Sequence, residues 1–191
     1  FQRALRMTAS TPSDFLPSPA PATALRTTML GTLREVDVGT TPALVGWVHR
    51  RRDLGGVLFV DLRDRSGVAQ VSFGPDWTPP AALEEARKLG AEDVVRVEGE
   101  IHFRPDEARN PEMATGQVEL RATTLEILNR ARTPEIPVYR APEEELPSEN
   151  LRLRYRNLDL RRPELQRNLG LRHALVLATR NYLSGLGFLE V

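Results

Sequence analysis

The feature that most constrains the fold of this chain is a series of five short stretches in which apolar and polar residues alternate. Period-two alternation with many β-branched residues is typical of strands that bury one face and expose the other. The pattern predicts five strands, over residues 43–52, 56–63, 67–73, 93–103 and 117–127. Gly55-Gly56 and Arg65-Ser66-Gly67 supply tight turns between the first three strands.

A single helix is expected between the third and fourth strands. Apolar residues recur at helical spacing between Pro79 and Leu89, a proline suits the first turn, and Gly90 suits the C-cap. Three strands, a helix and two strands is the element order of an OB-fold, a small Greek-key barrel. On the pattern alone, another small β-barrel is the alternative.

Composition excludes several classes of protein and site. The 191 residues carry 26 basic and 26 acidic side chains, which argues against a polybasic nucleic-acid-binding arm. The absence of Cys removes disulfides, Cys-ligated zinc and thiol nucleophiles, and no apolar stretch approaches the roughly 18 residues of a membrane span. All basic residues but Lys88 are Arg, which reflects either a compositional habit or selection for planar contacts to phosphates and bases.

Changes in composition along the chain predict four parts. Residues 1–28 are rich in Pro, Ala and Thr and are expected to be a disordered tail, and the OB-fold should occupy residues 29–130. A Pro- and Glu-rich hinge is expected over 131–160. Residues 161–191 should begin a second domain, with a helix from Pro163 to Leu186 and a strand starting at Phe188. The helix carries one apolar stripe, formed by Leu171, Leu175, Ala178, Tyr182 and Leu186.

Alternation places Phe59 on the outer face of its strand, because Leu58 and Val60 point toward the core. An outward aromatic either packs under a loop or a second domain, or serves as a platform on which a nucleobase stacks. The same logic puts Gln70 beside Phe59, where its amide can read a base edge or can simply face solvent. In the fourth strand, Phe103 is expected inward and Arg104 outward.

The run His49-Arg50-Arg51-Arg52 ends the first strand next to this outer face. It is either a clamp for phosphates and bases or a surface cluster balanced by nearby Asp residues. A second basic block lies at the end of the hinge, over residues 152–162, and interdomain ion pairs are an equal explanation for it. No Gly-rich phosphate loop, metal-ligand spacing or nucleophile–base pair is present, and the three His residues are scattered. The chain by itself is therefore predicted to be a binding module, with no catalytic or metal-binding residue.

Three segments resemble the bacterial aspartyl-tRNA synthetases. They are GWVHRRRDLGGVLFVDLRDRSGVAQV at residues 46–71, MATGQVEL at 113–120 and LRLRYRNLDLRR at 151–162. The triple Arg followed by Asp-Leu-Gly favours the aspartyl family over its lysyl and asparaginyl relatives. The resemblance covers about residues 29–191, and it implies an anticodon-binding OB-fold, a hinge and the start of a large α+β class II catalytic domain.

The resemblance also implies roles for individual residues. Phe59 would stack on the central anticodon uridine of tRNA(Asp), Gln70 would read that base, and Arg52, Arg50 and Glu119 would lie at the anticodon. The candidate contacts to the RNA backbone are Arg51, Arg104 and Arg154. The helix beginning at Pro163 would form part of class II motif 1, which builds a homodimer interface.

The family's full-length members activate L-aspartate with ATP and Mg²⁺ and transfer it to tRNA in the cytoplasm. The motifs that bind ATP and Mg²⁺ are not found in these 191 residues, so the chain alone is expected to be inactive. Neither a membrane nor DNA is expected as a partner. Two other functions stay open at this point. The chain could be a stand-alone, non-catalytic OB-fold module for nucleic acid, or an interaction protein that dimerises through its last helix.

Overall fold

The computed structural model describes residues 22–139 and 144–191. They divide into two compact units, one ending at Glu135 and the other running through Ile136–Val191. Most of the expected tail, residues 1–21, lies outside the described residues, as do residues 140–143 of the expected hinge.

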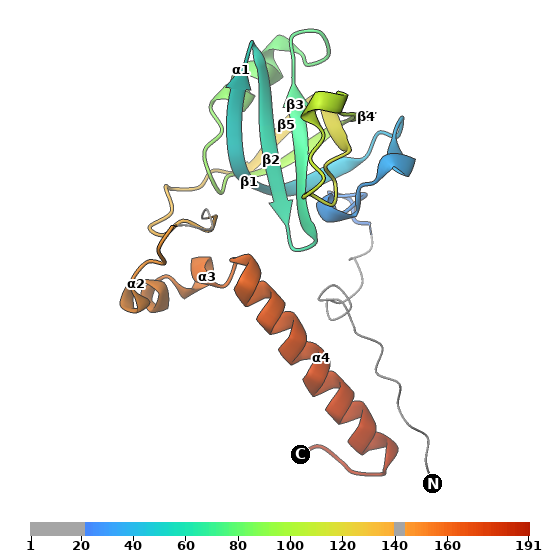
Figure 1. The fold of residues 1–191 in the computed structure, drawn as a ribbon, viewed down its shortest axis with the longest axis vertical. Coiled ribbons are helices and arrows are strands. Elements are labelled where there is room, and N and C mark those ends of the chain that lie inside the picture. Colours follow the sequence, from blue (N-terminus) through green and yellow to red (C-terminus); the bar gives the residue numbers. More distant parts are fainter. Residues whose placement is uncertain (1–21, 140–143) are drawn as a thin grey trace. The chain divides into compact units, whose positions relative to one another are not determined.

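The first unit is a closed five-stranded barrel with the strand order β1-β2-β3-β5-β4 (Figure 1). All pairs are antiparallel except β3 with β5. This topology confirms the expected OB-fold, and the strand bounds differ from the predicted ones by two residues or fewer. The strands are β1 (Ala43–Leu54), β2 (Val57–Asp64), β3 (Gly67–Phe73), β4 (Val94–Phe103) and β5 (Val118–Asn129).

Alternation along the strands fills the barrel with aliphatic side chains. The fully buried members include Leu44, Leu58, Val60, Leu62, Val71, Val95, Val97, Ile101 and Leu120. The β1–β2 hairpin turns at Gly55 and Gly56, whose φ angles of 62° and 89° suit the glycine-favouring turn expected there. Helix α1 (Pro80–Arg87) covers one end of the barrel with Leu83 and Ala86 (Figure 1).

The opposite end of the barrel is closed by the short 3₁₀ helix η2 (Leu30–Thr32), which packs on the β2–β3 hairpin. The backbone N–H groups of Leu30 and Gly31 donate to Asp64 Oδ2 at 2.9 Å and Ser66 Oγ at 2.8 Å. A Cβ on residue 31 would lie 2.1 Å from the Ser66 carbonyl oxygen, so only glycine allows this approach. Two further 3₁₀ turns, η3 (Glu35–Asp37) and η4 (Asp106–Ala108), lie in loops.

The second unit contains the expected long helix, α4 (Pro163–Gly185), after the short helices α2 (Glu149–Arg154) and α3 (Arg156–Asp159). The buried Asp159 carboxylate accepts hydrogen bonds from Arg156 at 2.5 Å and from Arg162 at 2.8 Å, which ties α3 to the start of α4. The apolar stripe of α4 is exposed, with Leu175 and Tyr182 at 65% and 68%. The strand expected from Phe188 is wrong, because residues 188–191 have no strand partner and form no regular structure.

Within the barrel, a buried ion pair joins β2 to the turn before β4. Arg63 Nη2 donates to both carboxylate oxygens of Glu92, at 2.9 and 3.0 Å, and Arg63 Nη1 lies 3.0 Å from His49 Nδ1. Since a guanidinium can only donate, Nδ1 must accept and His49 must be neutral here. Burial, with a smaller contribution from Arg63, lowers the pKa of His49 below its ordinary value.

This lowered pKa makes stability dependent on pH in a defined direction. The unfolded chain binds a proton near pH 6.5, whereas folded His49 resists it, so the stability that neutral His49 contributes is lost as the pH falls from about 7 toward 5. We expect His49→Gln, which can still accept from Arg63, to show a smaller loss of Tm between pH 7.5 and 5.5 than the parent chain. His173→Gln, on the exposed face of α4, is the matched control. An unchanged pH dependence in His49→Gln would contradict this assignment.

Candidate nucleic-acid interface

Phe59 lies at the middle of β2 on the outer face of the barrel, opposite the core. Its neighbours Leu58 and Val60 are buried inside, whereas Phe59 itself is half-buried. It pairs with Arg52 on β1 and with Ser72 on β3. The predicted face of Phe59 is therefore confirmed, and an aromatic ring stands on a surface made of polar neighbours.

The polar neighbours of Phe59 form a hydrogen-bonded chain across β1, β2 and β3. Arg52 Nη2 donates to Asp61 Oδ1 at 3.1 Å and to Gln70 Oε1 at 3.2 Å. Asp61 and Gln70 are paired residues of adjacent strands, and both are buried. Gln70 is thus beside Phe59, as alternation predicted, but its side chain is held by partners on both sides instead of facing solvent.

Glu119 on β5 completes the chain of contacts. Its Oε2 accepts from Gln70 Nε2 at 2.8 Å, and its Oε1 accepts from Ser72 Oγ at 3.2 Å. Glu119 is 6% exposed, and a buried carboxylate is stable only when its oxygens have donors. Because Glu119 accepts from the amide nitrogen and Arg52 donates to the amide oxygen, the orientation of the Gln70 amide is fixed.

The remaining candidate Arg residues are spread over several places. Arg50 is paired with Asp61 and is exposed, so it lies at the edge of the face that carries Phe59. Arg51 alternates with Arg50 and Arg52 along β1 and therefore does not share their face. Its guanidinium donates to the Arg87 carbonyl at the end of α1. Arg154 belongs to α2 in the second unit, with its guanidinium 5.6 Å from the Tyr155 ring.

The expected orientations of Phe103 and Arg104 are both wrong. Arg104 is 4% exposed, and its Nε donates to the Val118 carbonyl at 2.9 Å, so it does not present a cation at the surface. Burial lowers the pKa of the Arg104 guanidinium, against the opposing effect of Glu119. Phe103 is 47% exposed instead, with Arg109 at 5.9 Å from its ring centre. Strand β4 ends at Phe103, so alternation no longer decides which way these two side chains point.

One contact beside this network, between Arg121 and Trp77, was not identified from the sequence. Arg121 on β5 lies with its guanidinium over the Trp77 ring, 4.9 Å from the ring centre. Alternation along the strand predicts that Arg121 faces outward with Glu119, but it does not reveal the ring on which Arg121 lies. Trp77 lies in the turn after β3, where no periodicity exists to assign a direction.

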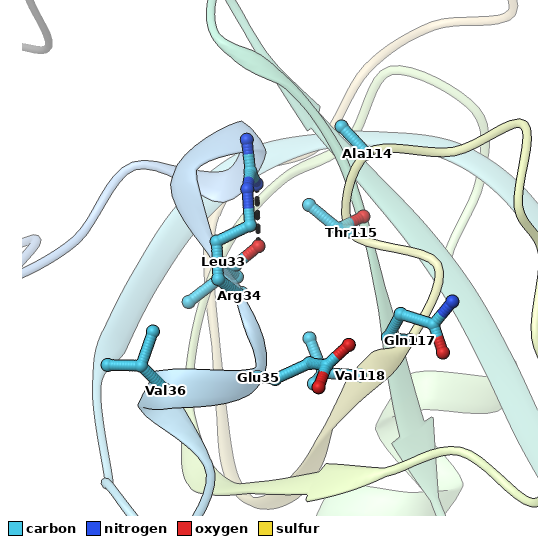
Figure 2. Close-up of a pocket in the computed structure, with 8 residues that line it drawn as sticks. All are labelled: Leu33, Arg34, Glu35, Val36, Ala114, Thr115, Gln117 and Val118. Atoms are coloured by element: carbon cyan, nitrogen blue, oxygen red, sulfur yellow. Dashed lines mark hydrogen bonds between the residues drawn. The ribbon is translucent and has the colours of Figure 1, made fainter.

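A pocket of about 280 Å³ lies between the segment after η2 and the loop before β5 (Figure 2). The lining residues are Leu33, Arg34, Glu35, Val36, Ala114, Thr115, Gln117 and Val118. Arg34 Nη1 donates to the Gly31 and Leu33 carbonyl oxygens, at 2.9 and 2.7 Å. The guanidinium of Arg34 therefore hydrogen-bonds to the adjacent backbone.

Within residues 22–139 and 144–191, no three His, Cys, Asp or Glu side chains come close enough to hold a metal ion. The described residues thus do not supply a site for the Mg²⁺ that the resemblance implies for a full-length enzyme. No helix in these residues has the length and apolar character needed to cross a bilayer.

Two protein families match separate parts of the chain. Residues 43–128 match the OB-fold nucleic acid binding domain, and residues 148–191 match the class II tRNA synthetases (D, K and N). The first match covers the barrel and the second covers α2 to α4. The chain therefore joins a barrel of a nucleic-acid-binding type to a small part of a synthetase catalytic domain.

Named relatives agree with both matches. The aspartate–tRNA(Asp/Asn) ligase of Thermosynechococcus vestitus is 48% identical over 87% of this chain, and that of Acidobacterium capsulatum is 45% identical over 93%. The chain spans a little over a quarter of these relatives, 28% of each.

Solved structures agree as well. The asparaginyl-tRNA synthetase of Pyrococcus horikoshii has a TM-score of 0.70 and 29% identity, over 86% of this chain and 36% of that one. The aspartyl-tRNA synthetase of Entamoeba histolytica shares the fold, with a TM-score of 0.75 and 20% identity over 92% of this chain and 41% of that one. Over most of its length, the chain is therefore homologous to bacterial aspartate–tRNA ligases, of which it spans a little over a quarter.

Proposed function

We propose that the barrel binds the anticodon loop of tRNA(Asp), with the central uridine stacked on Phe59 and its edge read by Gln70. The observation that carries the proposal is the placement of an outer-face aromatic beside an amide whose orientation is fixed from both sides. Sequence-specific recognition of RNA commonly stacks an unpaired base on an aromatic side chain and hydrogen-bonds its edge.

The fixed amide has capacity left for a base. An amide has two N–H donors and two acceptor lone pairs, and Arg52 and Glu119 use one of each. Uracil presents one N–H donor between two carbonyl acceptors, so a neighbouring acceptor and donor on Gln70 complement its edge. Cytosine has an acceptor nitrogen where uracil has this N–H, so cytosine would place that acceptor against the acceptor oxygen of Gln70. This difference supports discrimination between the two bases.

The neighbouring charges suit a nucleic-acid ligand that enters over this face. Arg52 is about one-third exposed, and Arg50 is exposed beside it, so both can approach phosphate or base atoms. Asp61 and Glu119 are buried below them and hold the donors in place. Arg51 and Arg154 stay as proposed contacts to the RNA backbone, whereas the burial of Arg104 removes it from that proposal.

We further propose that a full-length enzyme containing these residues activates L-aspartate with ATP in the cytoplasm and transfers it to tRNA(Asp). The proposal draws on the relatives, whose printed activity is aspartate–tRNA ligation. ATP, Mg²⁺ and aspartate are assigned to none of the residues described here. The exposed stripe of α4 supports a homodimer interface. The match of residues 148–191 to class II synthetases weighs against a stand-alone nucleic-acid module.

Replacing the stacking ring should weaken binding without changing the fold. We expect Phe59→Ala to lose about 1–3 kcal/mol of binding to a hairpin that carries the tRNA(Asp) anticodon, because base–aromatic stacking is worth that amount. Fluorescence anisotropy of a labelled hairpin measures the loss. Phe188→Ala removes an exposed aromatic outside the barrel and is the matched control. Equal affinity of Phe59→Ala and the parent chain would contradict the stacking role.

Replacing the amide should affect selectivity more than affinity. We expect Gln70→Leu to lose about 1 kcal/mol of the preference for central U over central C, the value of a typical hydrogen bond, while stacking on Phe59 still supports binding. The measurement compares dissociation constants for the two hairpins. Thermal melting of the variant separates this effect from damage to the network around Glu119. A preference that survives in a folded Gln70→Leu protein would rule out base reading by this amide.

A further inference from the structure

Arg121 of β5 lies on the same outer face of the barrel as Phe59. Phe59 pairs with Ser72, and Ser72 pairs in turn with Arg121, so the three residues form one row across β2, β3 and β5. Glu119, two residues before Arg121, contacts the side chains of Gln70 and Ser72, which confirms that β5 turns these positions toward the same face. Strands lie about 4.8 Å apart, so the Cα atoms of Phe59 and Arg121 are separated by about 10 Å.

The guanidinium of Arg121 is supported by a ring that is itself fixed. The guanidinium carbon lies 4.9 Å from the centre of the Trp77 ring. Trp77 Nε1 donates to the Ser72 carbonyl at 3.1 Å, and the indole covers Gly74 so closely that a Cβ there would lie 2.4 Å from a ring carbon. The aromatic support is thus locked to the same strand that carries Ser72.

Arg121 is held mainly by this stacking contact, because its ion pair is weak. Arg121 Nε lies 3.7 Å from Glu119 Oε1, beyond hydrogen-bond distance, and this buried nitrogen has no hydrogen-bond partner. Glu119 already accepts from Gln70 and Ser72. The Arg121 side chain is 37% exposed, so part of a planar cation faces outward from the row.

We propose that Arg121, supported by Trp77, is a second stacking position and binds the base of a nucleotide that flanks the one on Phe59. The inference rests on the proposed function, since it takes the same RNA loop as ligand. Unpaired bases stack on Arg guanidinium planes as well as on aromatic rings. The separation of about 10 Å from Phe59 exceeds the thickness of one stacked base, which suits a loop whose bases are splayed apart.

The test uses the full 191-residue chain and three hairpins: the anticodon hairpin, and two versions with an abasic site on one or the other side of the central uridine. We expect Arg121→Gln and Trp77→Leu each to weaken binding of the intact hairpin about five- to tenfold. With one of the two abasic hairpins, the same variants should bind as tightly as the parent chain does. Arg96→Gln is the matched control, because Arg96 lies on β4 and pairs with Glu98 and Glu126 away from this row.

Each other outcome overturns the proposal in a distinguishable way. Unchanged binding by Arg121→Gln, with a loss in Phe59→Ala, would remove the second position and leave the proposed function intact. An equal loss on all three hairpins would indicate a phosphate contact instead of a stacked base. Loss of binding in Trp77→Leu alone, with a lowered Tm, would show a structural role for the ring. If the parent chain binds no anticodon hairpin, both proposals fail.

Discussion

The outer face of the barrel depends on one chain of hydrogen bonds, which runs from the partly exposed Arg52 to the buried Gln70 and Glu119. These residues come from β1, β3 and β5, and Asp61 of β2 joins them through Arg52. In a low-dielectric setting such a network stabilises the fold only when its members have partners, and it is costly when one is removed. The same contacts that hold four strands together therefore also fix the group proposed to read a base.

Closure of the barrel is what makes this network achievable. Gln70 and Glu119 are 49 positions apart in the chain, and they meet because β3 and β5 pair in parallel. The inner faces of these strands are apolar, with Phe73 of β3 among the aliphatic side chains, so no polar group competes for space inside. Burying Leu58, Val60 and Val71 forces their neighbours outward, and the ring of Phe59 is among them. The core thus determines the composition of the surface that meets a ligand.

The alternating pattern was sufficient to predict five strands, the core, and the outward position of Phe59. It was sufficient because a strand with one buried face has a strict period of two. The prediction failed where that period ends: Phe103 and Arg104 exchange their expected environments at the last residue of β4. Phe188 begins no strand, since a strand needs a partner and none lies beside it in the described residues.

The contacts of the candidate site were harder to predict than its fold. Gln70 was placed beside Phe59 by alternation, but its hydrogen bonds depend on the pairing of β3 with β5, which local patterns do not specify. The role of Glu119 came only from family resemblance. Trp77 lies in a turn, and its contact with Arg121 follows from close packing on Gly74, which no sequence period reveals.

The central claim is that this face distinguishes the middle base of an anticodon loop. The most direct measurement compares the binding of the parent chain to four hairpins that differ only in that base. We expect the hairpin with U to bind tightest. Cytosine and adenine present an acceptor where uracil presents the N–H that Gln70 Oε1 complements, and guanine, which shares that donor and acceptor, is a larger two-ring base. Equal affinity for all four hairpins would contradict it, because a platform that only stacks has no means of telling them apart.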